Sequence, residues 1–153
     1  MRYTMIFAKG ATIFLLLFLF GVGMQARAQN QTPANAAPPV GWTDPATGLA
    51  WTTEDNGSDV NWSQATTYCS NQRLGGYSDW RLPTIDELQG IYDASAIVGD
   101  YHVKGNLKLS GNYQWSSTQK NAGQAWFYVF IKGKRYSFRI SDSKSDRALC
   151  VRR

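Results

Sequence analysis

An uncharged and mostly apolar run lies near the start of the chain. It covers residues 10–24, and Arg2 and Lys9 precede it. A charged head followed by an apolar middle is the pattern of a secretory signal peptide, and the run is short for a membrane-spanning helix. Small side chains then stand where a signal peptidase reads them, so we predict cleavage between Ala28 and Gln29. An uncleaved membrane anchor is the alternative that this pattern leaves open.

The predicted signal peptide covers residues 1–28. The segment that follows it has a different composition. Residues 29–41 contain three prolines and no large apolar side chain before Val40. Such a segment cannot bury a core, so we predict a disordered linker there. The remaining residues, 42–153, suffice for one domain with one core.

Apolar residues at helical spacing predict two amphipathic helices, each with a capping box at its start. In a capping box, the N-cap residue and the residue three positions later bond each other's backbone through their side chains. Asn61 with Gln64 carries this signal for the first helix, and Thr84 with Glu87 carries it for the second. We expect the first helix to end at Gly75-Gly76, because glycine is favoured just after a helix.

The last third of the chain changes to the two-residue period of β-strands. Residues 124–131 are apolar on both faces, which predicts a central strand buried on both sides, with Trp126 directed inward. Lys132-Gly133 is expected to turn the chain, and a last short strand is expected over residues 148–152. One strand, two helices and then several strands predict an α+β fold.

The strand after this turn alternates between apolar and polar side chains. The apolar ones, Tyr136, Phe138 and Ile140, fall on one face. The basic and hydroxyl ones, Arg135, Ser137 and Arg139, fall on the other. We therefore expect one buried face and one solvent-exposed, basic face.

Charge is divided unevenly along the predicted mature chain. Residues 29–100 contain two basic and nine acidic residues, a net charge of −7. Residues 101–153 contain eleven basic and two acidic residues, a net charge of +9. Such asymmetry indicates a charged partner, unless the two halves fold together and neutralise each other. The sequence leaves both interpretations open.

Two cysteines, Cys69 and Cys150, remain after the predicted cleavage. In an exported protein, an even number of cysteines indicates a disulfide. A bond that closes about 80 residues stabilises a fold by about 4 kcal/mol in the chain-entropy model. Free catalytic thiols would need a partner base, and the single histidine, His102, is better explained as a solvated loop residue.

The other polar clusters have structural explanations. The acidic run at residues 54–59 has oxygen atoms suited to calcium but lacks the spacing of an EF-hand, so a turn is favoured. Asp79 and Arg81 flank Trp80 and are candidates for a buried pair. Trp62 is placed inward on the first helix, and the direction of Trp115 is left undecided. We predict no catalytic residue, metal site or cofactor.

Five blocks of the sequence resemble one bacterial family, the C-terminal domain of the Legionella collagen-like adhesin. The blocks are residues 44–51, 62–69, 76–84, 113–118 and 147–152. The most specific of them reads Gly-Tyr-Ser-Asp-Trp-Arg-Leu-Pro-Thr. The resemblance covers residues 42–153 and implies a recognition domain related to one associated with sulfated polysaccharides. The collagen-like repeats of that adhesin are absent, so its trimerising stalk is not implied.

A more distant similarity links Arg81-Leu82-Pro83-Thr84 to the formylglycine-generating-enzyme group and the cysteine placement to the C-type lectin-like fold. This similarity implies two helices packed on a small, twisted, mostly antiparallel sheet. It also implies a bond between a cysteine on the first helix, Cys69, and one on the final strand, Cys150. The triplets with which that fold binds sugars through calcium are absent, which argues against calcium-assisted recognition.

Six basic residues on the predicted hairpin and in the loop after it form the candidate ligand-binding site. They are Lys132, Lys134, Arg135, Arg139, Lys144 and Arg147. Arginine suits bidentate contact with sulfate, phosphate or carboxylate groups. The alternative is that these charges only protect an exposed strand from pairing with another chain.

The leading hypothesis is an exported, non-catalytic recognition domain of the adhesin type. It would bind an anionic polysaccharide or cell-surface glycan, in the periplasm or outside the cell. An enzyme or enzyme-accessory domain on a formylglycine-generating-enzyme-like scaffold is one alternative, and a purely structural envelope protein is another. Nucleic acid is not expected as a partner, because export removes most of the opportunity and no nucleic-acid motif is present.

Overall fold

The strands form two separate sheets, and the chain passes from one to the other near its end. The computed structural model describes residues 41–142 and 146–153, which belong to one compact unit. The predicted signal peptide, the linker up to residue 40 and Lys144 lie outside the described residues. Within the described part, no helix combines the length and apolarity needed to cross a membrane.

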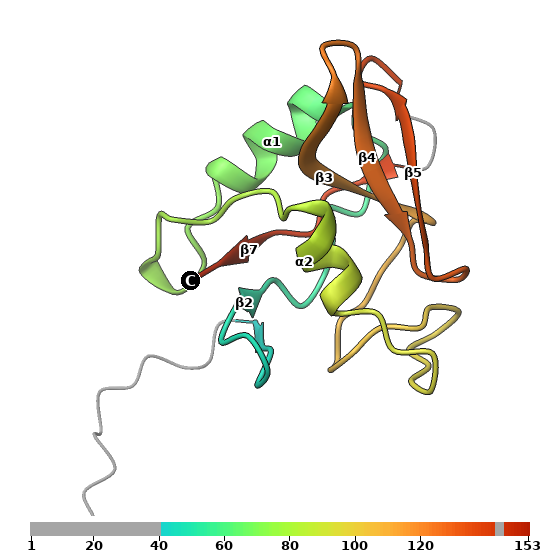
Figure 1. The fold of residues 1–153 in the computed structure, drawn as a ribbon. Helices are drawn as coiled ribbons and strands as arrows, with labels where there is room; N and C mark the ends of the chain where they lie inside the picture. The colour runs from blue at the N-terminus through green and yellow to red at the C-terminus, as the bar shows by residue number, and fades with distance from the viewer. Residues whose placement is uncertain (1–40, 143–145) are drawn as a thin grey trace, which may run out of the picture. The chain divides into compact units, whose positions relative to one another are not determined.

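The smaller sheet joins the start of the domain to its end (Figure 1). Its strand order is β1-β2-β7, and both pairings are antiparallel. The strands are β1 (Trp42–Thr43), β2 (Ala50–Trp51) and β7 (Val151–Arg152). Trp51 is fully buried in this sheet, so the first strands are anchored by a core side chain as well as by backbone bonds.

The larger sheet has the strand order β5-β4-β3-β6. It consists of β3 (Tyr113–Asn121), β4 (Gln124–Val129), β5 (Lys134–Arg139) and β6 (Asp146–Arg147). The β3–β4 and β4–β5 pairs are antiparallel, and the short β6 pairs parallel to β3. The α+β class is confirmed, but two sheets stand where one mostly antiparallel sheet was expected.

Both predicted helix starts are confirmed. Helix α1 (Trp62–Ser70) and helix α2 (Ile85–Gly90) begin with complete capping boxes. The end of α1 was predicted wrongly, because the helix stops at Ser70 and the two glycines belong to a separate 3-10 turn (Leu74–Gly76). The residues between helix and turn are polar and have no apolar face to bury, which removes the packing that would extend α1.

Strand β4 is central and buried on both faces, as its sequence predicts. Ala125, Phe127 and Val129 pack into one core cluster together with α1. Tyr128 and the following Phe130 pack into a second cluster together with α2. The two clusters lie on opposite sides of the sheet, so this one strand connects the two halves of the core.

The apolar face of β5 differs from the prediction. Tyr136 and Phe138 were expected to be buried but are 42 % and 45 % exposed, and only Ile140 is partly buried against the core. The reason is the reach of the covering helix: α1 lies beside β3, whereas β5 is at the far edge of the sheet (Figure 1). The sheet therefore extends beyond the helix that covers it.

The end of the chain contains two strands where one was predicted. Of the expected strand over residues 148–152, only the last two residues form a strand, β7, and the second strand, β6, comes before residue 148 and belongs to the other sheet. The connection, Ala148–Leu149–Cys150, is fully buried. These three residues carry the chain through the core from one sheet to the other.

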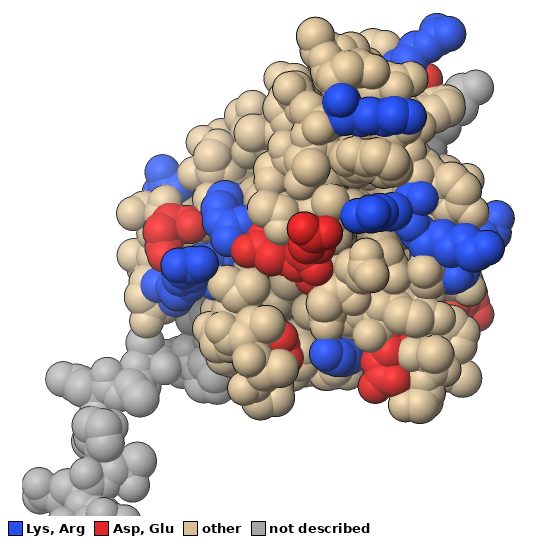
Figure 2. Space-filling model, in the orientation of Figure 1, with Lys and Arg blue, Asp and Glu red and all other residues tan. Residues whose placement is uncertain are grey.

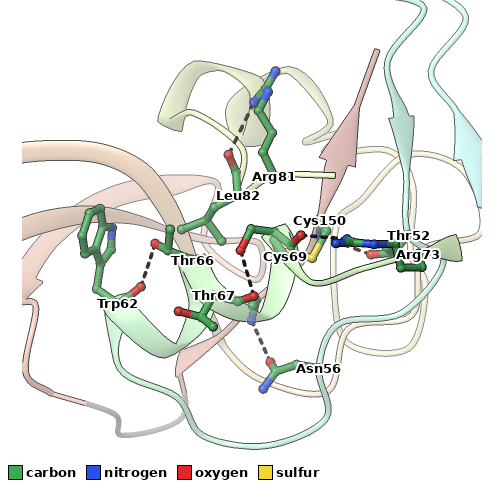
Figure 3. Close-up of a disulfide and its surroundings, with 12 residues drawn as sticks. Thr52, Asn56, Trp62, Thr66, Thr67, Cys69, Arg73, Arg81, Leu82 and Cys150 are labelled. Atoms are coloured by element: carbon green, nitrogen blue, oxygen red, sulfur yellow. Dashed lines mark hydrogen bonds between the residues drawn. A yellow bond between two sulfur atoms is a disulfide. The ribbon is translucent and has the colours of Figure 1, made fainter. Parts of the chain in front are cut away.

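The disulfide between Cys69 and Cys150 is confirmed. It joins α1 to the residue immediately before β7, with the two Cα atoms 5.3 Å apart (Figure 3). Both cysteines are fully buried. The bond thus fixes the covering helix to the segment that passes between the two sheets.

Candidate binding surface

The basic face of β5 forms a surface around one tryptophan. Arg135, Ser137 and Arg139 alternate with Tyr136 and Phe138 along the strand, so the two sets lie on opposite faces of the sheet. The register places Ser137 opposite Trp126 of β4. Trp126 therefore lies on the basic face and is only partly buried, whereas the sequence placed it inward.

Two cations lie over the Trp126 ring. The Lys120 Nζ atom is 5.4 Å from the ring centroid, and the guanidinium carbon of Arg135 is 5.6 Å from it. Lys120 also donates a hydrogen bond of 3.2 Å to the Ser137 hydroxyl. We call this surface the Trp126 platform. It consists of Lys120, Trp126, Arg135, Ser137 and Arg139.

The platform has an acidic neighbour in α2. Arg135 lies 3.7 Å from Asp86, and both side chains are mostly exposed. An exposed pair of this kind contributes little to stability, so Arg135 can leave it for another anion at small cost. Figure 2 shows Lys and Arg side chains over the hairpin side of the molecule, beside a group of acidic side chains near the centre of the view.

The other predicted binding residues do not all join this platform. Lys134 is exposed but alternates with Arg135, so it projects to the opposite face, and Lys132 lies in the turn before β5. Arg147 belongs to β6, at the opposite edge of the sheet from β5, and forms an ion pair with Asp59. Its side chain is only 13 % exposed, so Arg147 is a structural residue.

Lys120 is the platform residue that sequence analysis missed. It lies near the end of β3, where the pairing with β4 is irregular. A two-residue period therefore does not predict which face its side chain takes. The only signal in the sequence was that Lys120 lies close to the predicted hairpin along the chain.

The block at residues 76–84 forms a structural corner, and Asp79 and Arg81 do not pair as the sequence suggested. Exposed Asp79 accepts a 2.8 Å hydrogen bond from Arg152, whereas Arg81 makes a double hydrogen bond to Glu87 at 2.8 and 2.6 Å. The hydrogen bond and charge of Arg81 hold the pKa of the Glu87 carboxyl below its usual value. The backbone of Arg81 pairs with Val151, so the block connects α2 to the last strand.

A comparison with known protein families identifies the family of this domain. The family model for the Lcl C-terminal domain matches residues 41–152. The chain belongs to the Lcl C-terminal domain family. A search of curated proteins found no match.

In this Lcl C-terminal domain the acidic run and the histidine have structural roles. Buried Asp55 accepts hydrogen bonds from the Ser110 backbone and hydroxyl at 2.7 and 2.6 Å and from Gln114 at 3.0 Å, which fixes the turn to the sheet. His102 is partly buried, lies 3.0 Å from the Ala96 carbonyl and meets Tyr92 edge-on, so it is more enclosed than the predicted solvated residue. Among residues 41–142 and 146–153, no three His, Cys, Asp or Glu side chains gather as metal ligands.

Trp115 and Trp62 of the Lcl C-terminal domain have packing roles. Trp115, whose direction was left open, is fully buried and donates to the Val60 carbonyl at 2.9 Å. Trp62 is partly buried and donates to the Ser116 carbonyl at 2.8 Å. A buried indole with its N–H satisfied is a packing group, which leaves Trp126 as the tryptophan set among exposed cations.

Proposed function

We propose that this chain is an exported, non-catalytic recognition domain that binds anionic polysaccharide, sulfated or acidic, through the Trp126 platform. The observation that carries the proposal is the arrangement of Lys120, Arg135 and Arg139 around a partly exposed tryptophan. Sugar rings can stack on an aromatic face, and arginine and lysine can contact sulfate or carboxylate groups at its rim.

The spacing along β5 supports a polymer as the ligand. Arg135 and Arg139 are four residues apart on one face, which corresponds to about 13 Å along an extended strand. Successive anionic groups of one polymer chain could meet both arginines. Ser137, between them, adds a hydroxyl that can bond a sugar hydroxyl.

Two further observations support a non-catalytic domain in an oxidising compartment. Both cysteines are joined in one disulfide, so neither is a nucleophile. The bond from the first helix to the segment before the final strand agrees with a C-type lectin-like fold, and we include that fold in the proposal. The predicted signal peptide provides the route of export.

The test is retention of residues 29–153 on a heparin column. We expect Arg135→Ala with Arg139→Ala to abolish retention at moderate salt, and Lys120→Ala to lower the eluting salt concentration. Exposed charges are screened beyond about 8 Å at physiological ionic strength, so wild-type retention should fall steeply with salt. Surface substitutions usually cost under about 0.5 kcal/mol, so the melting temperature should barely change.

A matched control removes the same charge elsewhere. Lys108 and Arg153 are exposed and lie outside the platform, so Lys108→Ala with Arg153→Ala should keep most of the retention. Equal losses in both double variants would reduce the effect to net charge and contradict a defined site. Absence of wild-type retention at low salt would contradict polyanion binding altogether.

A further inference from the structure

A pocket lies on the face of the larger sheet opposite the Trp126 platform. Its volume is about 450 Å³, within the range of small-molecule sites. Its lining comes from all four strands of the sheet and from the turn before β5. The side chains that the argument uses are Tyr113, Phe127, Lys132, Tyr136, Phe138 and Asp146.

Four aromatic rings form most of the pocket wall. Phe127 is in contact with the three others, whose ring centroids lie 5.1 Å (Tyr113), 5.9 Å (Tyr136) and 6.5 Å (Phe138) from its own. Tyr136 is stacked on Phe127, whereas Tyr113 and Phe138 meet it edge-on. Rings at different angles around one floor make a concave aromatic surface, and Tyr136 and Phe138 leave it open to solvent.

One carboxylate lines this aromatic pocket. Asp146 is 2 % exposed, and no hydrogen bond or ion pair joins its carboxylate to another residue in the described part of the chain. The charges that act on it are mainly negative, from Asp59 and Asp142, while Arg147 is engaged with Asp59. A buried carboxylate without a partner is costly, and the residues that the structure describes provide no positive group that pairs with it.

Lys132 does not supply that group. It follows β4, and two strand spacings separate β4 from β6, which is about 10 Å. Lys132 is also absent from the charges that act on Asp146. It stands toward the other end of the pocket, where it can meet an anionic or hydroxyl substituent of a ligand.

We propose that this pocket binds a small organic cation, an ammonium group covered by methyl or methylene carbons, with its charge against Asp146 and its carbons against the aromatic rings. Aromatic faces attract such cations, and a carboxylate beside them adds a direct charge contact. An anionic ligand would be repelled by Asp146 and its acidic neighbours. A neutral sugar ring could stack on the rings but would leave the Asp146 charge unmatched.

Binding should also depend on pH through Asp146. Burial, and then the charges of Asp59 and Asp142, raise the pKa of Asp146 to about 7, against the opposing effect of Arg147. The carboxyl is therefore neutral in mild acid and charged above neutral pH. Cation affinity should be high at pH 8 and fall toward pH 5.5.

The experiment compares choline with 3,3-dimethylbutan-1-ol, which has the same shape and no charge. Binding to residues 29–153 is followed by titration calorimetry and by the aromatic proton resonances of the pocket. We expect saturable binding of choline at pH 8 and at least tenfold weaker binding of the neutral analogue. Asp146→Asn should weaken choline at least tenfold and remove the pH dependence.

A second variant tests the rings without depending on Asp146. Tyr136→Leu with Phe138→Leu removes two exposed rings but keeps apolar bulk, and should also weaken choline at least tenfold. Arg139→Ala, on the opposite face, should leave choline binding unchanged. Equal binding of choline and its neutral analogue would overturn the proposal in favour of a simple apolar pocket, and absence of choline binding would overturn it as well. Neither result bears on heparin retention.

Discussion

At the scale of single residues, the burial of a tryptophan side chain depends on what lies across the sheet from it. Trp115 belongs to a polar strand segment and Trp126 to an apolar one, yet Trp115 is the fully buried residue of the two. Trp115 finds the Val60 carbonyl and the core under α1, whereas Trp126 faces Ser137 and lies beneath two cations. The partner strand and the covering helix decide the outcome, and neither is visible in the local pattern.

Asp146 gives a prediction about stability that is independent of any ligand. Its pKa in the folded protein is about 7, above the value of about 3.9 for an unfolded chain. The folded state therefore holds an extra proton between these values, and the stability that this proton contributes is lost as the pH rises from about 4 to about 7. The upper bound of this contribution is about 4 kcal/mol.

We expect Asp146→Asn to have almost no effect on the melting temperature at about pH 3, where Asp146 is protonated in both the folded and the unfolded chain. At pH 8 the variant should melt higher than the wild type, because it has no buried charge. Thermal unfolding of both proteins across this pH range measures the difference. A variant that is less stable than the wild type at pH 8 would show that the carboxylate is well stabilised in the fold.

At the scale of secondary-structure elements, the disulfide is the main link between α1 and the segment before β7. The bonded residues are 81 apart, so in the chain-entropy model the bond stabilises the fold by about 4 kcal/mol. We expect reduction, or Cys69→Ala with Cys150→Ala, to lower the free energy of unfolding by about that amount. Urea denaturation with and without reductant provides the measurement. A change below about 1 kcal/mol would mean that packing alone holds α1 in place.

The elements that the sequence predicted well are those fixed by local chemistry. The capping boxes at Asn61 and Thr84 fix both helix starts, and the apolar run over residues 125–131 correctly indicates a central strand. The exposed face of β5 could not be predicted, because it depends on how far α1 reaches across the sheet. Fully buried Val103 and Leu107 were also missed, since they lie in an irregular segment without a periodic signal.

At the scale of the whole molecule, the fold neutralises part of the charge asymmetry through ion pairs and leaves other cations unpaired. Four ion pairs join cations of the second half to acids of the first: Lys108–Glu54, Arg135–Asp86, Arg147–Asp59 and Arg152–Asp79. Within the described residues, Lys120, Lys132, Lys134 and Arg139 make no such pair. Neutralisation between the two halves is therefore partial, and these four unpaired cations lie on and beside the hairpin, where the proposed polysaccharide site is.

Removal of the predicted signal peptide changes the net charge of the chain that carries this surface. Residues 1–28 contain three basic residues and no acidic ones, so cleavage lowers the net charge from +5 to +2. With so small an overall charge, attraction to a polyanion has to come from the local cluster on the hairpin.

We expect protein recovered from the envelope or the medium to have the intact mass of a chain that begins at Gln29 and carries one disulfide. Cyclisation of Gln29 would count as the same result. The small side chains up to Ala28 favour cleavage at that bond. Ala28→Arg is the matched test, because a bulky charged residue at the cleavage position should retain the leader. An envelope protein that keeps Met1 would contradict cleavage and leave the domain tethered to the membrane by its apolar run. A wild-type mass that is two hydrogens heavier than expected would contradict the oxidised state of Cys69 and Cys150.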